Sequence, residues 1–494
     1  MSRTTLTTPT LTRNGALLLA GLLLAGCTVG PAYNRPEFPI PEQHRPLTTE
    51  PEASSLADLP WWEVFKDPTL QELVREALVN NQDLAVAVAR VTEARAQAGV
   101  AKSYLWPEVN AGGSVAGERR SIITDPPLGQ GADRDITNAN LGFSLSWEID
   151  LFGRLRSQNQ AAVARMLATE QGQRAVVITL VGDVASSYFF LRELDLQLDV
   201  ARKTLVLNDE TVRFYTNRLA GGVSNRLELD QAVANRAATA AAIPEIERQI
   251  AITENALSVL LGRLPGAIPR GAALEAQYHP PQVPAGLPAA LLERRPDVVG
   301  AEQLMIAANA DIGAARALFF PTISLAGFFG GASKDLDGLF KADGTAASLT
   351  AGLFQPIFQA GRIRRNAEAA QARFDQALAE YRGAALNAYR EVADSLVTIE
   401  KLADVRTAQA ESVAALQDAS KLSRSRYDTG LSNYLEILIA DQSLFASELQ
   451  LAHTRGEELR AVARLYRALG GGWQVDEAEG GATQEEDVKT ATAP

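Results

Sequence analysis

Hydrophobic residues in this chain follow a helical period over several long stretches. From Pro68 to about Tyr104, apolar positions recur every three or four residues, which predicts a helix capped by Asp67. Residues 154–218 and 362–427 keep a helical period without a proline. At 1.5 Å per residue these two stretches predict helices of about 100 Å each. Each is followed by a glycine-containing turn and a second helical stretch, so the pattern predicts two long helical hairpins.

A period of two replaces the helical period in the segments 108–149 and 322–358. Apolar residues such as Leu141 and Phe143 alternate there with small or polar residues such as Ser144. This alternation predicts one antiparallel strand pair in each segment, with one apolar face and one polar face. Strands of about ten residues are long enough to cross a bilayer, although half-buried hairpins of a soluble domain show the same alternation.

The order of these patterns occurs twice in the chain. Leu105-Trp106-Pro107 reappears as Phe319-Phe320-Pro321, 214 positions later, whereas Gly153-Arg154 reappears as Gly361-Arg362, 208 positions later. We therefore expect an internal duplication in which the loop of the first strand pair is six residues longer. Two further irregularities are expected, a kink at Pro244 in the first return helix and a structural helix junction at 294–297.

The N-terminus has the features of an export signal. Basic residues precede the apolar stretch 15–25, which ends in Leu24-Ala25-Gly26-Cys27 and resembles a bacterial lipobox. Cys27 is the only cysteine in the chain, so we expect cleavage before it and attachment of diacylglycerol and an N-acyl chain. Thr28 follows where an aspartate would favour the inner membrane, which points to the outer membrane. The alternative is an ordinary secretory signal with an incidental thiol.

Composition excludes several classes of function. The formal charge of the 494 residues is −12 and no basic cluster is present, which argues against nucleic-acid binding. The three histidines lie in unrelated contexts, and neither a nucleophile elbow nor a phosphate-binding loop is found, so we expect no metal, no other cofactor and no enzymatic activity. No uninterrupted apolar run of transmembrane-helix length is found.

Four strands per chain are too few to close a membrane barrel, and open sheet edges in hydrocarbon leave backbone groups unpaired. The barrel must then close between chains, and a homotrimer gives twelve strands. The predicted fold class is an α+β membrane protein, a trimeric 12-stranded β-barrel continued by a long α-helical coiled-coil periplasmic tunnel, internally duplicated. A lipid-anchored periplasmic coiled-coil scaffold is the alternative, but it leaves the repeated strand pairs unexplained.

The predicted organisation follows the two repeats. Its segments are a signal peptide (1–26), a lipidated extended strap (27–66), a first repeat (67–266, with strand pair 108–149 and helical hairpin 154–262), a linker (267–287), a second repeat (288–472, with strand pair 322–358 and hairpin 362–470) and a disordered tail (473–494).

Several motifs, in this order, resemble the TolC superfamily of outer-membrane efflux channels, in particular its lipoprotein branch with OprM and the NodT-like proteins. The resemblance covers nearly everything from residue 27 to residue 473. The motifs are Cys27-Thr-Val-Gly-Pro-Ala-Tyr-Asn-Arg-Pro36, Trp61-Trp62-Glu-Val-Phe-Lys-Asp-Pro-Thr-Leu70, Arg294-Arg-Pro-Asp297, Ile312-Gly-Ala-Ala-Arg-Ala-Leu-Phe-Phe-Pro321 and Gln355-Pro-Ile-Phe-Gln-Ala-Gly-Arg362.

This resemblance implies the exit duct of a tripartite efflux system in the outer membrane, anchored by lipid and extending into the periplasm. Its implied partners are two further copies of the chain, a periplasmic adaptor protein and an inner-membrane pump of the RND type. The outer-membrane duct of a type I protein-secretion system is a second possibility within the channel class. The sequence does not indicate the transported substrate.

The resemblance also places a gate at the tip of the hairpins. Leu435 matches a gating leucine of the family, Glu436 a gating aspartate and Tyr427 a tyrosine that holds the tip closed. Where the family usually carries a further aspartate this chain has Ile439, and Asp441 lies two residues later, about 200° round the helix. An apolar constriction of Leu435 and Ile439 is therefore the alternative to an acidic ring, and ordinary coiled-coil packing explains both residues equally well.

In the first repeat, Glu228 and Asp230 are the counterparts of these gate candidates.

Overall fold

The computed structural model describes residues 29–40, 55–121, 134–277 and 288–471. By its internal contacts the chain divides into two compact units, and each unit draws on both repeats. The first unit lies within 1–37, 91–169 and 301–381, and the second within 38–90, 170–300 and 382–494. The compact units therefore cut across the repeats, whereas the predicted organisation followed them.

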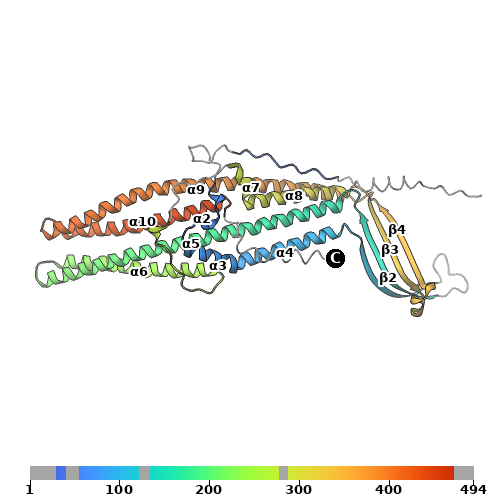
Figure 1. Ribbon diagram of the computed structural model, residues 1–494, viewed down its shortest axis with the longest axis horizontal. Coiled ribbons are helices and arrows are strands. Elements are labelled where there is room, and N and C mark those ends of the chain that lie inside the picture. Colours follow the sequence, from blue (N-terminus) through green and yellow to red (C-terminus); the bar gives the residue numbers. More distant parts are fainter. Residues whose placement is uncertain (1–28, 41–54, 122–133, 278–287, 472–494) are drawn as a thin grey trace, which may run out of the picture. The chain divides into compact units, whose positions relative to one another are not determined.

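The helices of the two repeats, labelled in Figure 1, have equal lengths by their residue ranges. The equivalent pairs are α4 (Gln82–Ser103) and α8 (Pro296–Ala317) with 22 residues, α5 (Arg154–Ala220) and α9 (Arg362–Asp428) with 67, and α6 (Arg226–Leu260) and α10 (Tyr434–Ala468) with 35. The remaining helices are α2 (Trp61–Val64), α3 (Pro68–Asn80) and α7 (Leu291–Arg294), with short 3-10 turns at Leu56–Asp58, Leu274–Ala276, Pro288–Ala290, Leu336–Phe340 and Ala342–Gly344.

Two predictions for the helical part of the chain need correction. The single helix expected from Pro68 to Tyr104 is divided at Asn81, whose extended backbone ends α3 and whose side-chain oxygen accepts from the Leu84 N–H of α4. Helix α6 continues through Pro244, and the kink expected at this proline stays a prediction. The end of the predicted extended strap is folded, because residues 56–65 contain two short helical turns and bury Leu56, Trp61 and Phe65.

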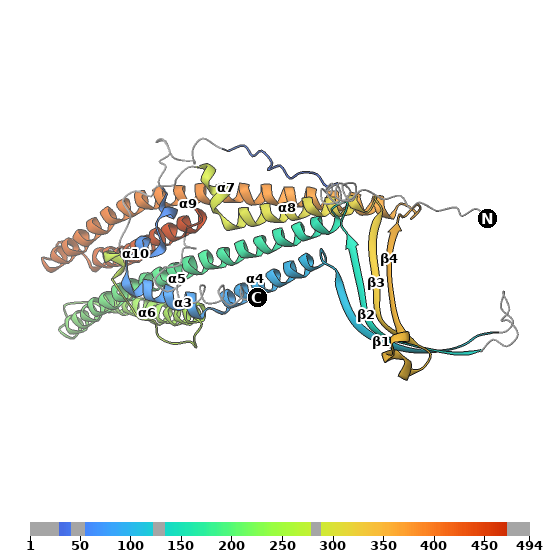
Figure 2. The ribbon, with the colours of Figure 1, turned by 45° about the vertical axis from the view of Figure 1, so that its right-hand side comes forward.

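One antiparallel sheet contains all four predicted strands, β1 (Glu108–Arg119), β2 (Asp135–Ile149), β3 (Thr322–Ser333) and β4 (Thr345–Phe354), in the order β1-β2-β3-β4 (Figure 2). Strands β1 and β4 are its two edges. The β1–β2 ladder has twelve residue pairs and the β3–β4 ladder ten, so part of the six-residue difference between the repeats lies in strands. The prediction that the loop alone carries this difference is wrong.

Alternation along the strands places most of the large apolar residues on one face, with Phe328 and Phe354 on the other. Leu145 pairs with Val109 on one side and Gly327 on the other, while Phe143 pairs with Phe329. Phe143 and Phe329 are 57% and 63% exposed, although neither is at an end of its strand. The chain by itself leaves this apolar face uncovered.

The core of the second unit is organised around the start of α3. Asp67 caps α3 by accepting from the Thr69 N–H at 2.9 Å, and its other oxygen accepts from Tyr188 at 2.8 Å and from Gln277 at 2.7 Å. Burial alone would raise the pKa of Asp67, but these hydrogen bonds outweigh burial and lower it. Gly271 is required here, because a Cβ at this position would overlap the carboxylate. The linker residues 267–277 are thereby fastened to the core.

The junction predicted at 294–297 is structural, as expected. Arg295 is buried between α7 and α8 and donates to Glu391 of α9 at 2.8 Å, to Asp297 at 2.7 Å and to the Ala468 carbonyl near the end of α10 at 2.9 Å. Burial opposes the charged form, but the two carboxylates raise the pKa of Arg295. One buried guanidinium thus joins three helices.

Of the described helices, α5 is long and apolar enough to pass a simple test for a membrane-spanning helix. More than half of its most apolar window is buried inside the protein. A core helix has the same properties, and residues such as Val184, Tyr188 and Leu191 belong to the main core of the second unit.

Candidate functional site at the hairpin turns

The two hairpin turns of the second unit have the same backbone. The Gly222 N–H donates to the Leu219 carbonyl and the Val223 N–H to the Arg218 carbonyl, and Gly222 has a φ of +73°. At the second turn, Gly430 and Leu431 repeat these bonds one for one, with a φ of +74° at Gly430. Two such backbone hydrogen bonds around a residue in the left-handed conformation form a Schellman motif, which explains why both turns carry glycine.

The capping side chains at the first turn bond to their immediate neighbours. Asn225 caps α6 by accepting from the Glu228 N–H at 3.0 Å, and Ser224 donates to the Glu228 carboxylate. Arg226 donates to Asp230 one helical turn later at 3.0 Å, and both side chains are more than half exposed. Neither predicted acid of the first turn contacts the other hairpin in the described structure.

At the second turn the equivalent side chains have different partners. Glu436 forms an ion pair with Arg426 at 3.4 Å, with about half of each side chain exposed. Ser432, the counterpart of Ser224, buries its hydroxyl without a hydrogen-bond partner among the described residues. Asn433 begins α10 without a side-chain cap. Each turn thus leaves one buried polar atom without a partner among the described residues, the Ser432 hydroxyl at the second turn and the Arg218 Nε at the first, but only the first turn has a side-chain cap.

The predicted apolar pair is exposed on α10. Leu435 is 48% exposed and Ile439 55%, one helical turn apart, so the chain by itself does not bury them. Leu227, the equivalent of Leu435 in the first repeat, is 65% exposed and was missed, although the 208-residue offset points to it. Gln231 stands where the second repeat has Ile439, so only the second turn carries the apolar pair.

Asp441 lies away from this exposed pair. It accepts from Ser420 at 2.6 Å and from Arg424 at 2.7 Å, both on α9, and its side chain is 11% exposed. Asp441 thus joins α10 to α9. An acidic side chain held in this way stabilises the hairpin and is not part of an exposed surface.

An aromatic cluster joins the two hairpins behind the turns. The Tyr215 ring of α5 is 1% exposed and lies 4.5 Å from the Tyr434 ring of α10 and 5.9 Å from the Tyr427 ring of α9. Arg218 lies 5.5 Å above the Tyr427 ring. Burial raises the pKa of Tyr215, and burial together with Asp441 raises the pKa of Tyr434 to about 12. Tyr427 contacts the other hairpin, whereas the central residue, Tyr215, was not predicted.

A chain of amides makes a second connection between the hairpins. Asn208 of α5 is buried and donates to Thr239 of α6 at 2.9 Å, and it accepts from Asn235 of α6 at 3.1 Å. Gln442 of α10 in turn donates to Asn235 at 3.1 Å. The two hairpins of one chain are therefore held together by both aromatic and polar contacts near the turns.

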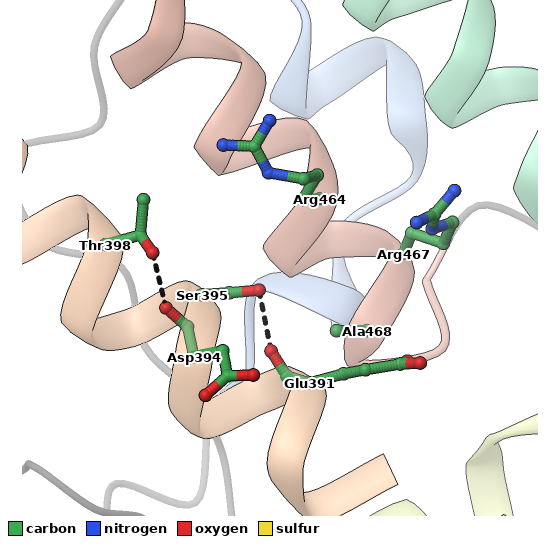
Figure 3. Close-up of a pocket in the computed structure, with 7 residues that line it drawn as sticks. All are labelled: Glu391, Asp394, Ser395, Thr398, Arg464, Arg467 and Ala468. Atoms are coloured by element: carbon green, nitrogen blue, oxygen red, sulfur yellow. Dashed lines mark hydrogen bonds between the residues drawn. The ribbon is translucent and has the colours of Figure 1, made fainter. Parts of the chain in front are cut away.

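A cavity of about 200 Å³ between α9 and α10, far from the turns in sequence, is a weaker candidate (Figure 3). Ser395 and Thr398 donate to the Glu391 and Asp394 carbonyls of their own helix. Glu391 also accepts from Arg295, and Arg464 forms an ion pair with Glu457. Because these groups are partnered by neighbouring residues, the cavity does not present convergent free polar groups for a ligand.

Cys27, the predicted lipidation site, lies outside the described residues, as do the signal peptide and the tail.

Comparison with known proteins gives consistent results over nearly the whole chain. Residues 73–263 and 287–471 match the family model described as "Outer membrane efflux protein". The chain is 36% identical over 477 residues to the solvent efflux pump outer membrane protein SrpC of Pseudomonas putida, covering 93% of this chain and 98% of SrpC. It is 36% identical over 456 residues to the cation efflux system protein CusC of Escherichia coli K12, covering 91% and 97%.

Among solved structures, the open state of the MtrE outer membrane channel of Neisseria gonorrhoeae is similar, with a TM-score of 0.81 and 31% identity over 91% of this chain and 99% of that one. These likenesses confirm the predicted fold class.

Proposed function

The chain belongs to the family of outer membrane efflux proteins, and from this premise we propose that three copies form one gated duct through which a tripartite efflux system discharges small molecules. An outer-membrane exit duct is the function that the family supports. The proposal adds the number of copies, the position of the gate, the lipid anchor and the partners.

The observation that carries the proposal is the incomplete sheet. Strands β1 and β4 each have one edge without a strand partner in the described structure, and the apolar face of the sheet is exposed. In hydrocarbon each unpaired backbone group costs several kcal/mol, so four strands cannot enter a membrane alone. Three copies close a barrel of twelve strands, which removes every edge and places the apolar face against lipid.

Two features support the remaining parts of the duct. Diacylglycerol and an N-acyl chain on Cys27 anchor the N-terminus in the outer membrane. On the periplasmic side the partners are an adaptor protein and an inner-membrane pump of the RND type, since the relatives are named as parts of efflux pumps and efflux systems. The duct itself is passive and catalyses no reaction. Its cargo, solvents or cations, follows from the pump.

The gate lies at the hairpin turns. Three copies place Leu435 and Ile439 around one axis as two apolar rings, with Leu227 of the first repeat at the level of Leu435 by the internal duplication. Apolar rings of this kind close a pore by excluding water. Glu436 beside them gives the mouth a negative potential that favours cations.

The test of the gate is single-channel conductance in planar bilayers. The double variant Leu435→Ser with Ile439→Ser should raise conductance several-fold, because two hydroxyl-bearing rings stay wet. A matched control, Leu227→Ser with Gln231→Ser, changes one apolar ring and one already polar position, so it should have a smaller effect. Equal conductance of the wild type and the Leu435/Ile439 variant would place the constriction elsewhere.

The efflux role is tested in cells. Deletion of the gene should sensitise the bacterium to solvents such as toluene or to metal cations, the substrates that the names of the relatives give, and the wild-type chain should restore resistance. Copurification from detergent then identifies the adaptor and the pump. Secretion of a protein that stops on deletion, with resistance to all small molecules unchanged, would instead support a protein-secretion duct.

A further inference from the structure

The intrachain contact between the two repeats provides a template for the contact between copies. Strand β2 ends the first strand pair and β3 begins the second, and these two strands pair with each other. A barrel that closes between copies needs one more contact of the same kind, between β4 of one copy and β1 of the next. This step rests on the proposed closure of the barrel by several copies.

Strand pairing shows that the duplication holds residue for residue within the sheet. Val109 pairs with Leu145 in the first repeat, and Ile323 pairs with Leu353 in the second. Val109 and Ile323 are 214 residues apart, whereas Leu145 and Leu353 are 208 apart. These are the offsets found in the sequence on either side of the strands, so no insertion lies between the strands and their flanking motifs. Every residue of β4 therefore has a defined equivalent in β2, and every residue of β1 one in β3.

We infer that β4 of one copy pairs with β1 of the next in the register that places Thr350 opposite Ala116 of the partner subunit. The template is the pair Gly142 and Gly330 in β2 and β3. Adding 208 to the first number and subtracting 214 from the second gives 350 and 116. The same operation places Leu353 opposite Gly113 of the partner subunit and Leu349 opposite Gly117 of the partner subunit.

This register keeps the two faces of the sheet separate. Leu349 and Leu353 are 71% and 72% exposed, on the same face as Phe329 and Phe143, and Val109 and Val115 share that face on β1. Both offsets are even numbers, so the apolar face of β4 meets the apolar face of β1. A register shifted by one residue would mix the faces and place serine or threonine against lipid.

The adjoining helices lead to the same interface. Within the chain, Ala161 and Ala164 of α5 pack against Ala307 and Ala310 of α8. The equivalents of the α5 pair are Ala369 and Ala372 of α9, and those of the α8 pair are Glu93 and Ala96 of α4. All four equivalents are exposed in the single chain, as the uncovered half of a repeated interface must be.

One aromatic contact of the template changes in a compensating way. Phe152 stacks on Phe320 at 4.8 Å between their ring centroids, at the base of β2 and β3. The equivalent positions hold Ala360 and Trp106, so one ring is lost and the other becomes larger. Trp106 is 69% exposed in the single chain, as expected of a ring that becomes buried against a neighbouring copy.

Disulfide cross-linking of the full-length protein in membranes tests the register. The double variant Thr350→Cys with Ala116→Cys should form covalent dimers and trimers on oxidation, because directly opposite residues have Cα atoms about 5 Å apart. Within one chain the three strand pairings place Thr350 level with Glu108, so the two cysteines are three strand spacings across the sheet and eight residues along it, about 30 Å apart, and cannot join. The matched controls pair Thr350→Cys with Ser114→Cys or Glu118→Cys, on the same face but two residues out of register. They should cross-link about tenfold less.

Three outcomes separate the inference from the function on which it rests. Preferred cross-linking of either control, or of no pair in a protein whose native mass is trimeric, overturns the register and leaves the duct intact. A native mass of one chain overturns both. If the cysteine variants do not assemble, Trp106→Ala in an otherwise unchanged chain should lower the temperature at which the trimer dissociates, and Trp106→Phe should restore part of it. An unchanged temperature in Trp106→Ala overturns the interface.

Discussion

The hairpin turns at Gly222 and Gly430 share one backbone conformation but differ in what their side chains contact. At the first turn Ser224, Asn225 and Arg226 satisfy their immediate neighbours. At the second turn a buried serine hydroxyl lacks a partner among the described residues, and Tyr427 and Tyr434 instead contact Tyr215 of the first hairpin. Duplication therefore preserved the fold of the turn and left its side chains free to diverge. The cap of the first turn is made by residues of that turn, whereas the tyrosines of the second turn pack on Tyr215 of the first hairpin.

Removal of the shared Tyr215 ring should produce the largest difference in local stability between the two turns. Tyr215→Ala empties the centre of the cluster, and large aromatic truncations in a core cost about 3–5 kcal/mol. Hydrogen exchange should accelerate at the start of α10 and leave the first turn nearly unchanged. Phe214→Ala is the matched control, because its ring is 42% exposed and should cost much less. Equal acceleration at both turns would show that the first turn also depends on the cluster.

Replacement of the acids on the two return helices should lower the free energy of unfolding by amounts that differ less. Asp441→Asn weakens the bonds from Ser420 and Arg424, and we expect a loss of about 1–2 kcal/mol, since Arg424 remains partly hydrated. The control Asp230→Asn affects an exposed pair with Arg226 and should cost about 0.5 kcal/mol or less. Chemical denaturation of the two variants measures both losses. A larger loss for the first-repeat variant would reverse the comparison.

Replacement of the serine by alanine should lower stability at the first turn but not at the second. Ser224→Ala removes a hydrogen bond to Glu228 and should destabilise the first turn by about 1 kcal/mol. Ser432→Ala removes a buried hydroxyl without a described partner, so it should be neutral or slightly stabilising. Thermal melts of both variants decide the matter, and a clear loss in Ser432→Ala would mean that its hydroxyl has a partner in the assembled protein.

The smallest effect on stability is expected at the exposed acid of the second turn. Glu436→Gln breaks a solvent-exposed ion pair with Arg426, which is worth between 0 and about 1 kcal/mol. Its effect should appear as a lower preference for cations over anions, read from the reversal potential in a salt gradient. Glu228→Gln, at the equivalent position, provides the comparison. Identical reversal potentials in the wild type and Glu436→Gln would remove Glu436 from the conducting path.

Periodicity and the repeat fixed most of the fold, because both are properties of neighbouring residues. The long helices end at Ala220 and Asp428, within two residues of the predicted ends. The break at Asn81 was missed, because the apolar stripe continues across it; Asn81 caps α4 through its side-chain oxygen and also donates to the Leu260 carbonyl, 179 residues away. Only the three-dimensional structure supplies such a partner.

In the candidate site, too, only residues with a local or repeated signal could be predicted from the sequence. Leu435 and Ile439 could be found from spacing and from family resemblance, and Leu227 could have been found from the 208-residue offset. Tyr215 could not, because its role comes from rings on α9 and α10 that lie more than 200 residues further along the chain. A tyrosine in a long helix has no local signal that distinguishes a shared cluster from ordinary packing.

The equal lengths of the outgoing helices, 67 residues in both repeats, restrict how this protein can change during evolution. Loss of one residue from α5 would rotate everything beyond it by about 100° and shorten that arm by about 1.5 Å. A tolerated deletion must then come close to whole turns, such as seven residues, and recur in the return helix and in both helices of the other repeat. Substitutions can accumulate separately in each repeat, but changes of length must be made in four places together.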